Sequence, residues 1–190
     1  MRPMRVAAAA VVGVAMLAGC SDGGTANETL PSTSTSAAQT TESLPPLGPP
    51  DLPMPDEARA QTAAGAEAFI RYYMDIYTAA QASMDPTYMD QFSQDCALCD
   101  GIIKNLRDDA AAGYSYDGGQ VTVTAASFGA ANDSRIEGAF SIDQASLAVL
   151  GKDGVSVTDL SAPPASLNCG AILSWSSHDA SWIFTQWDVN

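Results

Sequence analysis

The chain has few basic residues and a single histidine. Lys and Arg number 8 against 22 Asp and Glu in 190 residues, giving a formal net charge of −14. Nucleic-acid binding needs clustered Lys and Arg, and adhesion to anionic headgroups needs basic segments, so neither partner is expected. One histidine, His178, far from the cysteine pair offers no recognisable zinc spacing. We therefore expect no metal and no other cofactor.

Long hydrophobic runs are also missing after residue 19. The one apolar run, residues 6–17, follows Arg2 and Arg5 and is shorter than the roughly 20 residues that span a bilayer. This is the layout of a signal peptide. The run ends in Leu17-Ala18-Gly19-Cys20, which resembles a bacterial lipobox. Residues 1–19 are therefore predicted to be a lipoprotein signal peptide, with Cys20 as the lipidation site. An ordinary cleaved signal and an uncleaved anchor are the alternatives.

The lipobox resemblance implies a location. Bacterial lipoproteins carry two or three acyl chains, whereas one chain binds a bilayer only marginally. The partner of Cys20 would be the lipid bilayer, at the outer face of the cytoplasmic membrane. Residues 20–52 are rich in Ser, Thr and Pro and have few large apolar residues, so they are predicted to be a disordered tether spanning roughly 30 Å. Glycosylation of this tether stays open.

Residues 53–190 have the size of one domain, and their first half has helical periodicity. A helix is expected after Pro55, with acids in its first turn. Shorter helices are expected at 87–92 and at 96–112, the last ending at Gly113. The apolar positions that recur at three- and four-residue steps in the first helix are Ala66, Phe69, Ile70, Tyr73, Met74, Tyr77 and Ala80.

The second half alternates as strands do. Strands are expected at 121–124, 136–142, 171–175 and 182–187, the last two joined by a turn at His178. A hairpin is expected from 147–150 to 155–157, around the turn at 151–154. Helices before antiparallel strands predict an α+β domain, with the first helix packed on a curved sheet.

This order resembles the nuclear-transport-factor-2-like (NTF2-like) fold, a cone of sheet closed by helices. Pro53-Met54-Pro55-Asp56-Glu57-Ala58, Thr62, Gly65-Ala66-Glu67-Ala68-Phe69, Tyr72-Tyr73 and Cys96-Ala97-Leu98-Cys99 resemble a family of uncharacterised actinobacterial lipoproteins whose domain of unknown function is thought to be NTF2-like. The likeness covers about a third of the chain. The chain departs from the family at Met84-Asp85-Pro86, where a Thr-Gly-Asp turn is usual, and in its extra Cys169. The resemblance implies a fold and a location but no activity.

Three cysteines besides Cys20 cannot all pair within one chain. The loop-entropy model gives about 2 kcal/mol for a Cys96–Cys99 bridge and over about 4 kcal/mol for Cys99–Cys169. The family resemblance implies the Cys96–Cys99 disulfide, which leaves Cys169 free and buried. A redox-active Cys96-x-x-Cys99 is less favoured, because Asp95 and Asp100 oppose thiolate formation and no strand precedes the pair.

Aromatic residues are the best candidates for a ligand pocket inside the cone, although the favoured interpretation is that they simply fill the core. Tyr73 and Tyr77 have polar tips suited to a pocket role. His178 is expected in a solvated turn, and the acids Asp75, Asp108 and Asp109 on solvated helix faces, so no catalytic residue is predicted. The candidate pocket residues are Phe69, Tyr73, Tyr77, Phe92, Trp175, Trp182 and Trp187, with Tyr88 in the wider aromatic set.

These observations favour a membrane-tethered, non-enzymatic binding or interaction module of the cell envelope. Its partner would be an envelope protein or a small apolar molecule. The alternative is an NTF2-like enzyme of the isomerase or dehydratase type acting on a small apolar molecule in the cone. An envelope dithiol redox protein is a third hypothesis.

Overall fold

Helices precede strands in residues 46–190, the part of the chain that the computed structural model describes. The predicted signal peptide, Cys20 and residues 20–45 of the predicted tether lie outside the described residues. The mixed α+β class with antiparallel strands is confirmed. The elements are η1 (Asp56–Arg59), α1 (Ala63–Ser83), α2 (Thr87–Gln91), α3 (Ala97–Ala112), β1 (Ser115–Gly118), β2 (Val121–Phe128), β3 (Arg135–Gln144), β4 (Leu147–Leu150), η2 (Thr158–Leu160), β5 (Ala165–Ser176) and β6 (Ser181–Val189).

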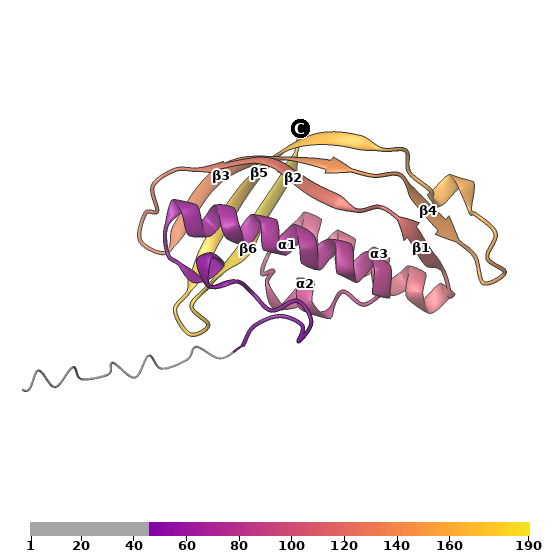
Figure 1. Ribbon diagram of the computed structural model, residues 1–190, viewed down its shortest axis with the longest axis horizontal. Coiled ribbons are helices and arrows are strands. Elements are labelled where there is room, and N and C mark those ends of the chain that lie inside the picture. Colours follow the sequence, from indigo (N-terminus) through magenta and orange to yellow (C-terminus); the bar gives the residue numbers. More distant parts are fainter. Residues whose placement is uncertain (1–45) are drawn as a thin grey trace, which may run out of the picture. The chain divides into compact units, whose positions relative to one another are not determined.

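The strands form two antiparallel sheets, one of four strands in the order β2-β3-β5-β6 and one of β1 with β4. The larger sheet curves over α1, with α2 and α3 on the same side (Figure 1). Register shifts between Val123 and Ala125, and between Ile172 and Leu173, mark bulges that bend the strands. The sheets stay open and do not close into a barrel.

The first long helix starts later than the sequence predicts. Pro55 opens the short 3-10 helix η1 instead, and Ala60 returns to an extended conformation. The indole nitrogen of Trp182 donates a hydrogen bond to the Ala60 oxygen at 3.0 Å, so this carbonyl group accepts a hydrogen bond from β6. Thr62 then caps α1 by accepting the Gly65 N–H at 3.0 Å.

The hairpin predicted at residues 147–157 is confirmed in part, because Leu150 and Ser156 form an isolated antiparallel bridge and Val157 N–H donates to the Val149 oxygen at 2.7 Å. The turn itself is present, since Gly154 N–H donates to the Gly151 oxygen at 2.9 Å. Residues 155–157 do not form a strand, however, and β4 pairs along its length with β1. Because Ser115-Tyr116-Asp117-Gly118 has no apolar alternation, periodicity could not identify β1.

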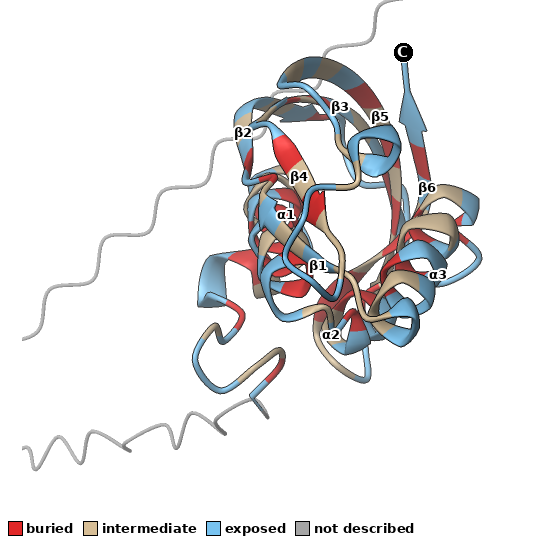
Figure 2. Ribbon diagram, turned by 90° about the vertical axis from the view of Figure 1, so that its right-hand side faces the viewer, coloured by how far each residue is buried: buried red, intermediate tan, exposed pale blue. Residues whose placement is uncertain are grey.

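The core lies between α1 and the concave face of the larger sheet. Buried positions on α1, α3 and the strands face inward in Figure 2. The α1 residues Phe69, Ile70, Tyr73 and Met74 are all buried, as their helical spacing predicts. The other expected strands are confirmed as parts of β2, β3, β5 and β6.

A segment expected to be tether is packed on the domain. We call residues 46–55 the strap. Leu47 is only 8% exposed, and Met54 N–H donates to its carbonyl oxygen at 2.9 Å. Within this loop Leu52 N–H donates to the Pro49 oxygen at 3.0 Å. The packed part of the chain therefore begins before residue 53.

Candidate functional site

The aromatic residues proposed as pocket lining pack against one another in the core. Phe69, Tyr73, Phe92, Trp182 and Trp187 are buried, whereas Tyr77 and Trp175 are half-buried. The Tyr73 and Phe184 ring centroids lie 4.7 Å apart, and those of Trp175 and Trp182 5.1 Å apart. Burial raises the pKa of the Tyr73 hydroxyl, which hydrogen-bonds the Ser93 hydroxyl at 2.6 Å. None of these seven lines the hollows described below.

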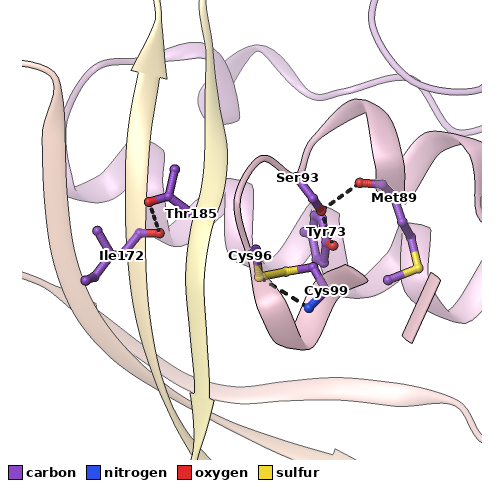
Figure 3. The surroundings of a disulfide bond; sticks show 7 residues. All are labelled: Tyr73, Met89, Ser93, Cys96, Cys99, Ile172 and Thr185. Carbon is purple, nitrogen blue, oxygen red and sulfur yellow. Dashed lines mark hydrogen bonds between the residues drawn. A yellow bond between two sulfur atoms is a disulfide. The ribbon is translucent and has the colours of Figure 1, made fainter. Parts of the chain in front are cut away.

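Cys96 and Cys99 are placed as a disulfide pair at the start of α3, with Cα atoms 5.2 Å apart. Figure 3 shows the pair beside Ser93 and Met89, on the side of α3 that faces β5 and β6. Both cysteines are 0% exposed, so an external thiol has no direct access to either sulfur. This burial disfavours a dithiol redox protein. Cys169 is buried and unpaired, and burial raises the pKa of its thiol.

The disulfide follows a segment that covers the edge of the large sheet. Phe184 N–H donates to the Phe92 oxygen at 2.9 Å, and Gln94 N–H donates to the Phe184 oxygen at 2.9 Å. These bonds pair the loop between α2 and α3 with the outer edge of β6. The disulfide ring begins two residues later, at Cys96.

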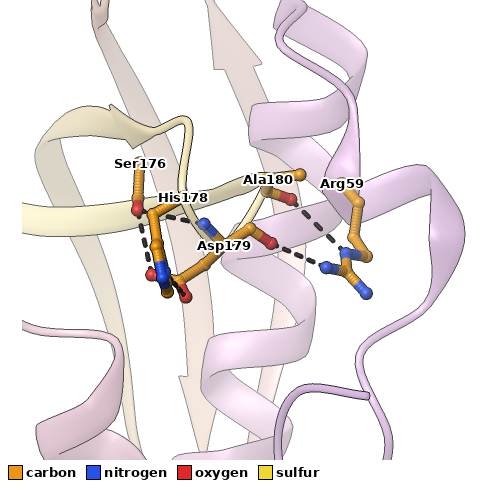
Figure 4. A network of polar contacts seen from close by, with 5 residues as sticks. All are labelled: Arg59, Ser176, His178, Asp179 and Ala180. Carbon is orange, nitrogen blue, oxygen red and sulfur yellow. Dashed lines mark hydrogen bonds and ion pairs between the residues drawn. The ribbon is translucent and has the colours of Figure 1, made fainter. Parts of the chain in front are cut away.

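His178, Asp179 and Ser176 form a polar turn between β5 and β6 (Figure 4). His178 Nδ1 lies 2.8 Å from Asp179 Oδ1, and the Ser176 hydroxyl donates to Asp179 Oδ2 at 2.9 Å. These bonds hold the pKa of Asp179 below its ordinary value. Nucleophilic catalysis would need the serine to bond the histidine, not the aspartate. Because His178 is also 94% exposed in its side chain, the turn is structural.

Arg59 connects this turn to η1, donating to the carbonyl oxygens of Asp179 at 2.6 Å and Ala180 at 3.4 Å.

The three helical acids differ in their surroundings. Asp108 pairs with Lys104 on the exposed face of α3. Asp109 is half-buried and accepts the Tyr116 hydroxyl at 2.5 Å, a contact that the sequence did not predict. Asp75 is exposed overall, but partial burial of its carboxyl raises its pKa.

Two hollows flank the strap where it crosses α1, and Leu52 lines both. The Tyr88 hollow has a volume of about 480 Å³, and the Arg71 hollow about 420 Å³. The Tyr88 hollow is lined by Pro49, Asp51, Leu52, Ile76, Ala79, Ala80, Ala82, Ser83, Asp85 and Tyr88. The Arg71 hollow is lined by Leu52, Pro53, Pro55, Glu57, Ala68, Arg71, Tyr72 and Asp75.

The sequence explains why the surface recedes here. The last turns of α1 carry Ala79, Ala80, Ala82 and Ser83, whose short side chains leave space beside the strap. The strap itself approaches Tyr72 closely, because the Tyr72 hydroxyl donates to the Leu52 oxygen at 3.1 Å. The hollows therefore arise from small helix residues next to a backbone held by one buried tyrosine.

The walls of the Tyr88 hollow contribute charge. Asp85 Oδ1 accepts both the N–H of Thr87 at 3.0 Å and its hydroxyl at 2.6 Å. These hydrogen bonds, with a smaller contribution from Arg107, hold the pKa of Asp85 below its ordinary value. Asp85 thus stays ionised at neutral pH. Sequence reasoning missed both hollows, although Tyr88 was in its wider aromatic set.

Two further features bear on function. Within residues 46–190 no helix is long and apolar enough to cross a membrane. In the same part of the chain, no group of three or more His, Cys, Asp or Glu residues is arranged to hold a metal ion.

Solved structures match the chain at low sequence identity and with TM-scores below 0.5. The intermembrane space region of the chloroplast protein ARC6 is 15% identical over 68% of this chain and 97% of that one, with a TM-score of 0.47. A Catenulispora acidiphila protein solved in complex with S-DNPA is 14% identical over 66% of this chain and 92% of that one, with a TM-score of 0.40. At this level of similarity neither structure supports an inference about function.

No curated protein matches the sequence. Residues 37–186, which include the strap, all helices of the described part and most of the sheet, match a family of unknown function, DUF6318. The chain belongs to this family.

Proposed function

We propose that this chain is a lipid-anchored binding module of an actinobacterial cell envelope, with an NTF2-like folded part. The lipobox-like Leu17-Ala18-Gly19-Cys20 and the Ser/Thr/Pro-rich stretch that follows support the anchor. The order of three helices before a curved antiparallel sheet supports the NTF2-like assignment. The module would sit on the outer face of the cytoplasmic membrane, with an envelope protein or a small molecule as its ligand.

One observation carries the binding proposal, namely the pair of hollows on either side of the strap. Each has a volume within the range of small-molecule sites. Aliphatic and proline side chains make up most of the wall of the Tyr88 hollow and half of the wall of the Arg71 hollow. By contrast, the hollow at the turn between β2 and β3 is bounded by residues that, apart from Ile136, are exposed. We therefore place ligand binding at the strap.

The anchor is tested by Cys20→Ala in cells of the source organism or an actinobacterial host. We expect the wild-type chain in the membrane fraction and the variant in the soluble fraction, with the same melting temperature. Metabolic labelling with palmitate should mark only the wild type. A variant that stays in the membrane fraction would contradict lipid anchoring through Cys20.

The binding site is tested by an NMR screen of a mixed fragment library against the full chain. Shift changes should cluster on residues of the two hollows. Ala79→Trp fills the Tyr88 hollow from an exposed helix position and should abolish binding there. Ala111→Trp, at an exposed position on α3 away from the hollows, is the matched control. Hits that cluster elsewhere, or that survive Ala79→Trp and an equivalent block of the Arg71 hollow, would contradict the proposal.

A second candidate is an NTF2-like enzyme of the isomerase or dehydratase type. The contact that favours it is the hydrogen bond from Tyr116 to the half-buried Asp109, because a positioned carboxylate and phenol can move protons. Turnover in a panel of isomerase and dehydratase substrates, lost in Asp109→Asn and kept in Asp108→Asn, would establish it. Turnover unaffected by Asp109→Asn would remove it.

A further inference from the structure

The Tyr88 hollow has carboxylates on different walls and an apolar floor. Asp51 comes from the strap, and Asp85 from the loop that enters α2. The floor includes Ile76 and Ala80 of α1, which are 2% and 3% exposed. Tyr88, half-buried on α2, adds an aromatic ring to the same lining. A ligand here would contact aliphatic carbon, a π system and negative charge together.

Within the described part of the chain, neither carboxylate forms an ion pair. Among residues 46–190 no hydrogen bond to Asp51 is present either. Asp85 uses only Oδ1 for its two bonds to Thr87, which leaves Oδ2 available. Arg107, the cation that influences Asp85, is itself paired with Asp90 at 2.7 Å. Among the described residues that line the hollow there is no Lys, Arg or His.

Such a lining matches one ligand chemistry. An ammonium group is attracted electrostatically by both carboxylates and by the face of an aromatic ring. A hydrocarbon chain attached to the ammonium adds binding free energy by burying apolar surface against Ile76, Ala80 and the neighbouring alanines. The net charge of the chain, −14, also raises the local concentration of cations around it.

We propose that the Tyr88 hollow binds an amphipathic organic cation, with its ammonium between Asp51 and Asp85 and its apolar body on the α1 floor. The inference rests on the proposed binding function and adds the chemical class of the ligand. The ammonium belongs to a free alkylamine or to a lysine side chain of a peptide, and the experiment separates these two sources.

The test compares three probes with the same phenyl group and a chain of similar length, whose head groups are cationic, neutral and anionic. Binding of 4-phenylbutylammonium, 4-phenylbutanol and 4-phenylbutanoate to the full chain is followed by NMR shifts of the hollow residues. We expect the amine to bind about tenfold more tightly than the alcohol, and the acid not to bind. Added salt should weaken binding of the amine and leave binding of the alcohol unchanged.

Single substitutions then locate the ammonium. Asp51→Asn should weaken amine binding about threefold, and the double variant with Asp85→Asn about tenfold. Asn at position 85 still offers an oxygen to Thr87, so the start of α2 is kept. Asp159→Asn makes the same charge change at an exposed residue outside the hollow and is the matched control. Unchanged melting temperatures show that each variant folds.

A pair of peptides identifies the source of the ammonium. Acetyl-Phe-Lys-amide binding more tightly than the free amine, with acetyl-Phe-norleucine-amide weaker than both, would assign a peptide lysine. If the free amine binds more tightly than acetyl-Phe-Lys-amide, the ligand is assigned as a free amine.

Equal binding of the alcohol and the amine would overturn the cation inference and leave the binding module standing. An effect of Asp159→Asn as large as that of Asp51→Asn would also overturn it, since only overall charge would then matter. The inference would also be overturned if the amine changed the NMR shifts only of residues outside the hollow. Fragment hits at the strap would in that case still support the binding module.

Discussion

Replacing Gly48 by alanine tests how tightly the strap is held on α1. Gly48 has φ +84°, a left-handed conformation that costs an alanine roughly 1 kcal/mol. A Cβ there would lie 1.7 Å from the Tyr72 hydroxyl oxygen, far inside contact distance. The hydroxyl must move and lose its bond to Leu52, which contributes about 1 kcal/mol. We therefore expect Gly48→Ala to lower the free energy of unfolding by about 2 to 3 kcal/mol.

Urea unfolding followed by circular dichroism measures this loss. Gly101→Ala is the control of opposite sign, because a Cβ at that position in α3 meets nothing within 4 Å. Alanine is the better helix former, so the control should gain up to about 1 kcal/mol.

A double-mutant cycle identifies the cause. Tyr72→Phe removes the atom that the new Cβ would strike, although the ring carbon Cζ at 3.0 Å stays close. In that background Gly48→Ala should cost mainly the backbone contribution, giving a coupling of about 1 kcal/mol or more. Additive effects of the two substitutions would refute the argument, because Gly48 and Tyr72 would then not be in contact.

Three further changes follow from the described contacts. Cys96→Ser with Cys99→Ser should lower the free energy of unfolding by about 2 kcal/mol through loss of the short ring, measured by urea unfolding. A chain that carries Cys20→Ala alone keeps the disulfide and should have one reactive thiol, Cys169. Because Cys169 is buried, this thiol should react only after denaturation. Asp179→Asn should cost roughly a few tenths of a kcal/mol at pH 7. The pKa of Asp179 is lowered in the fold, so this stabilisation exists above the ordinary carboxyl pKa of about 4 and disappears as pH falls through the lowered value. Gln81→Met should change the melting temperature little, because it removes a buried side-chain oxygen without a partner among the described residues, a gain of about 1 kcal/mol, and also the hydrogen bond between the Gln81 side chain and the Tyr77 hydroxyl, a loss of about 1 kcal/mol.

Each of these has a contrary outcome. Two additional thiols after denaturation without reductant would show that Cys96 and Cys99 are not bonded. A stability difference for Asp179→Asn that persists at pH 2 would mean that the turn does not depend on the ionised carboxylate. A fall in the melting temperature of Gln81→Met by many degrees would mean that the Gln81 oxygen also has a hydrogen-bond partner in solution.

The helical half of the fold could be predicted because its signals are local. Apolar residues recur every three or four positions from Ala66 to Ala80, and Gly113 ends α3 with φ +80° as expected. The strands β2 and β5 were predicted too short, because their outward faces carry Ser, Thr, Ala and Gly. The partner of β4 was missed, since β1 is defined by pairing and not by composition.

The strap and its hollows could not be predicted, because they depend on contacts between distant residues. Proline-rich residues 46–52 have the composition of a linker, and only Leu47 and Leu52 are large and apolar there. Leu47 is nevertheless buried and Leu52 half-buried, and the hydrogen bond from the Tyr72 hydroxyl to the Leu52 oxygen joins this loop to α1. Similarly, periodicity predicts that aromatic residues face inward but not whether they leave a cavity or fill it.

The disulfide lies next to the segment that covers the β6 edge of the large sheet, so its loss should affect association between chains as well as stability. Phe92 and Gln94 occupy backbone groups of β6 that would otherwise be open to another strand. The ring at Cys96 limits how far this covering segment can move. Reduction should therefore expose an unpaired strand edge, and such edges promote association between chains. We expect the oxidised protein to stay monodisperse and the reduced protein to aggregate on mild heating, so that its solubility depends on the redox state of its compartment.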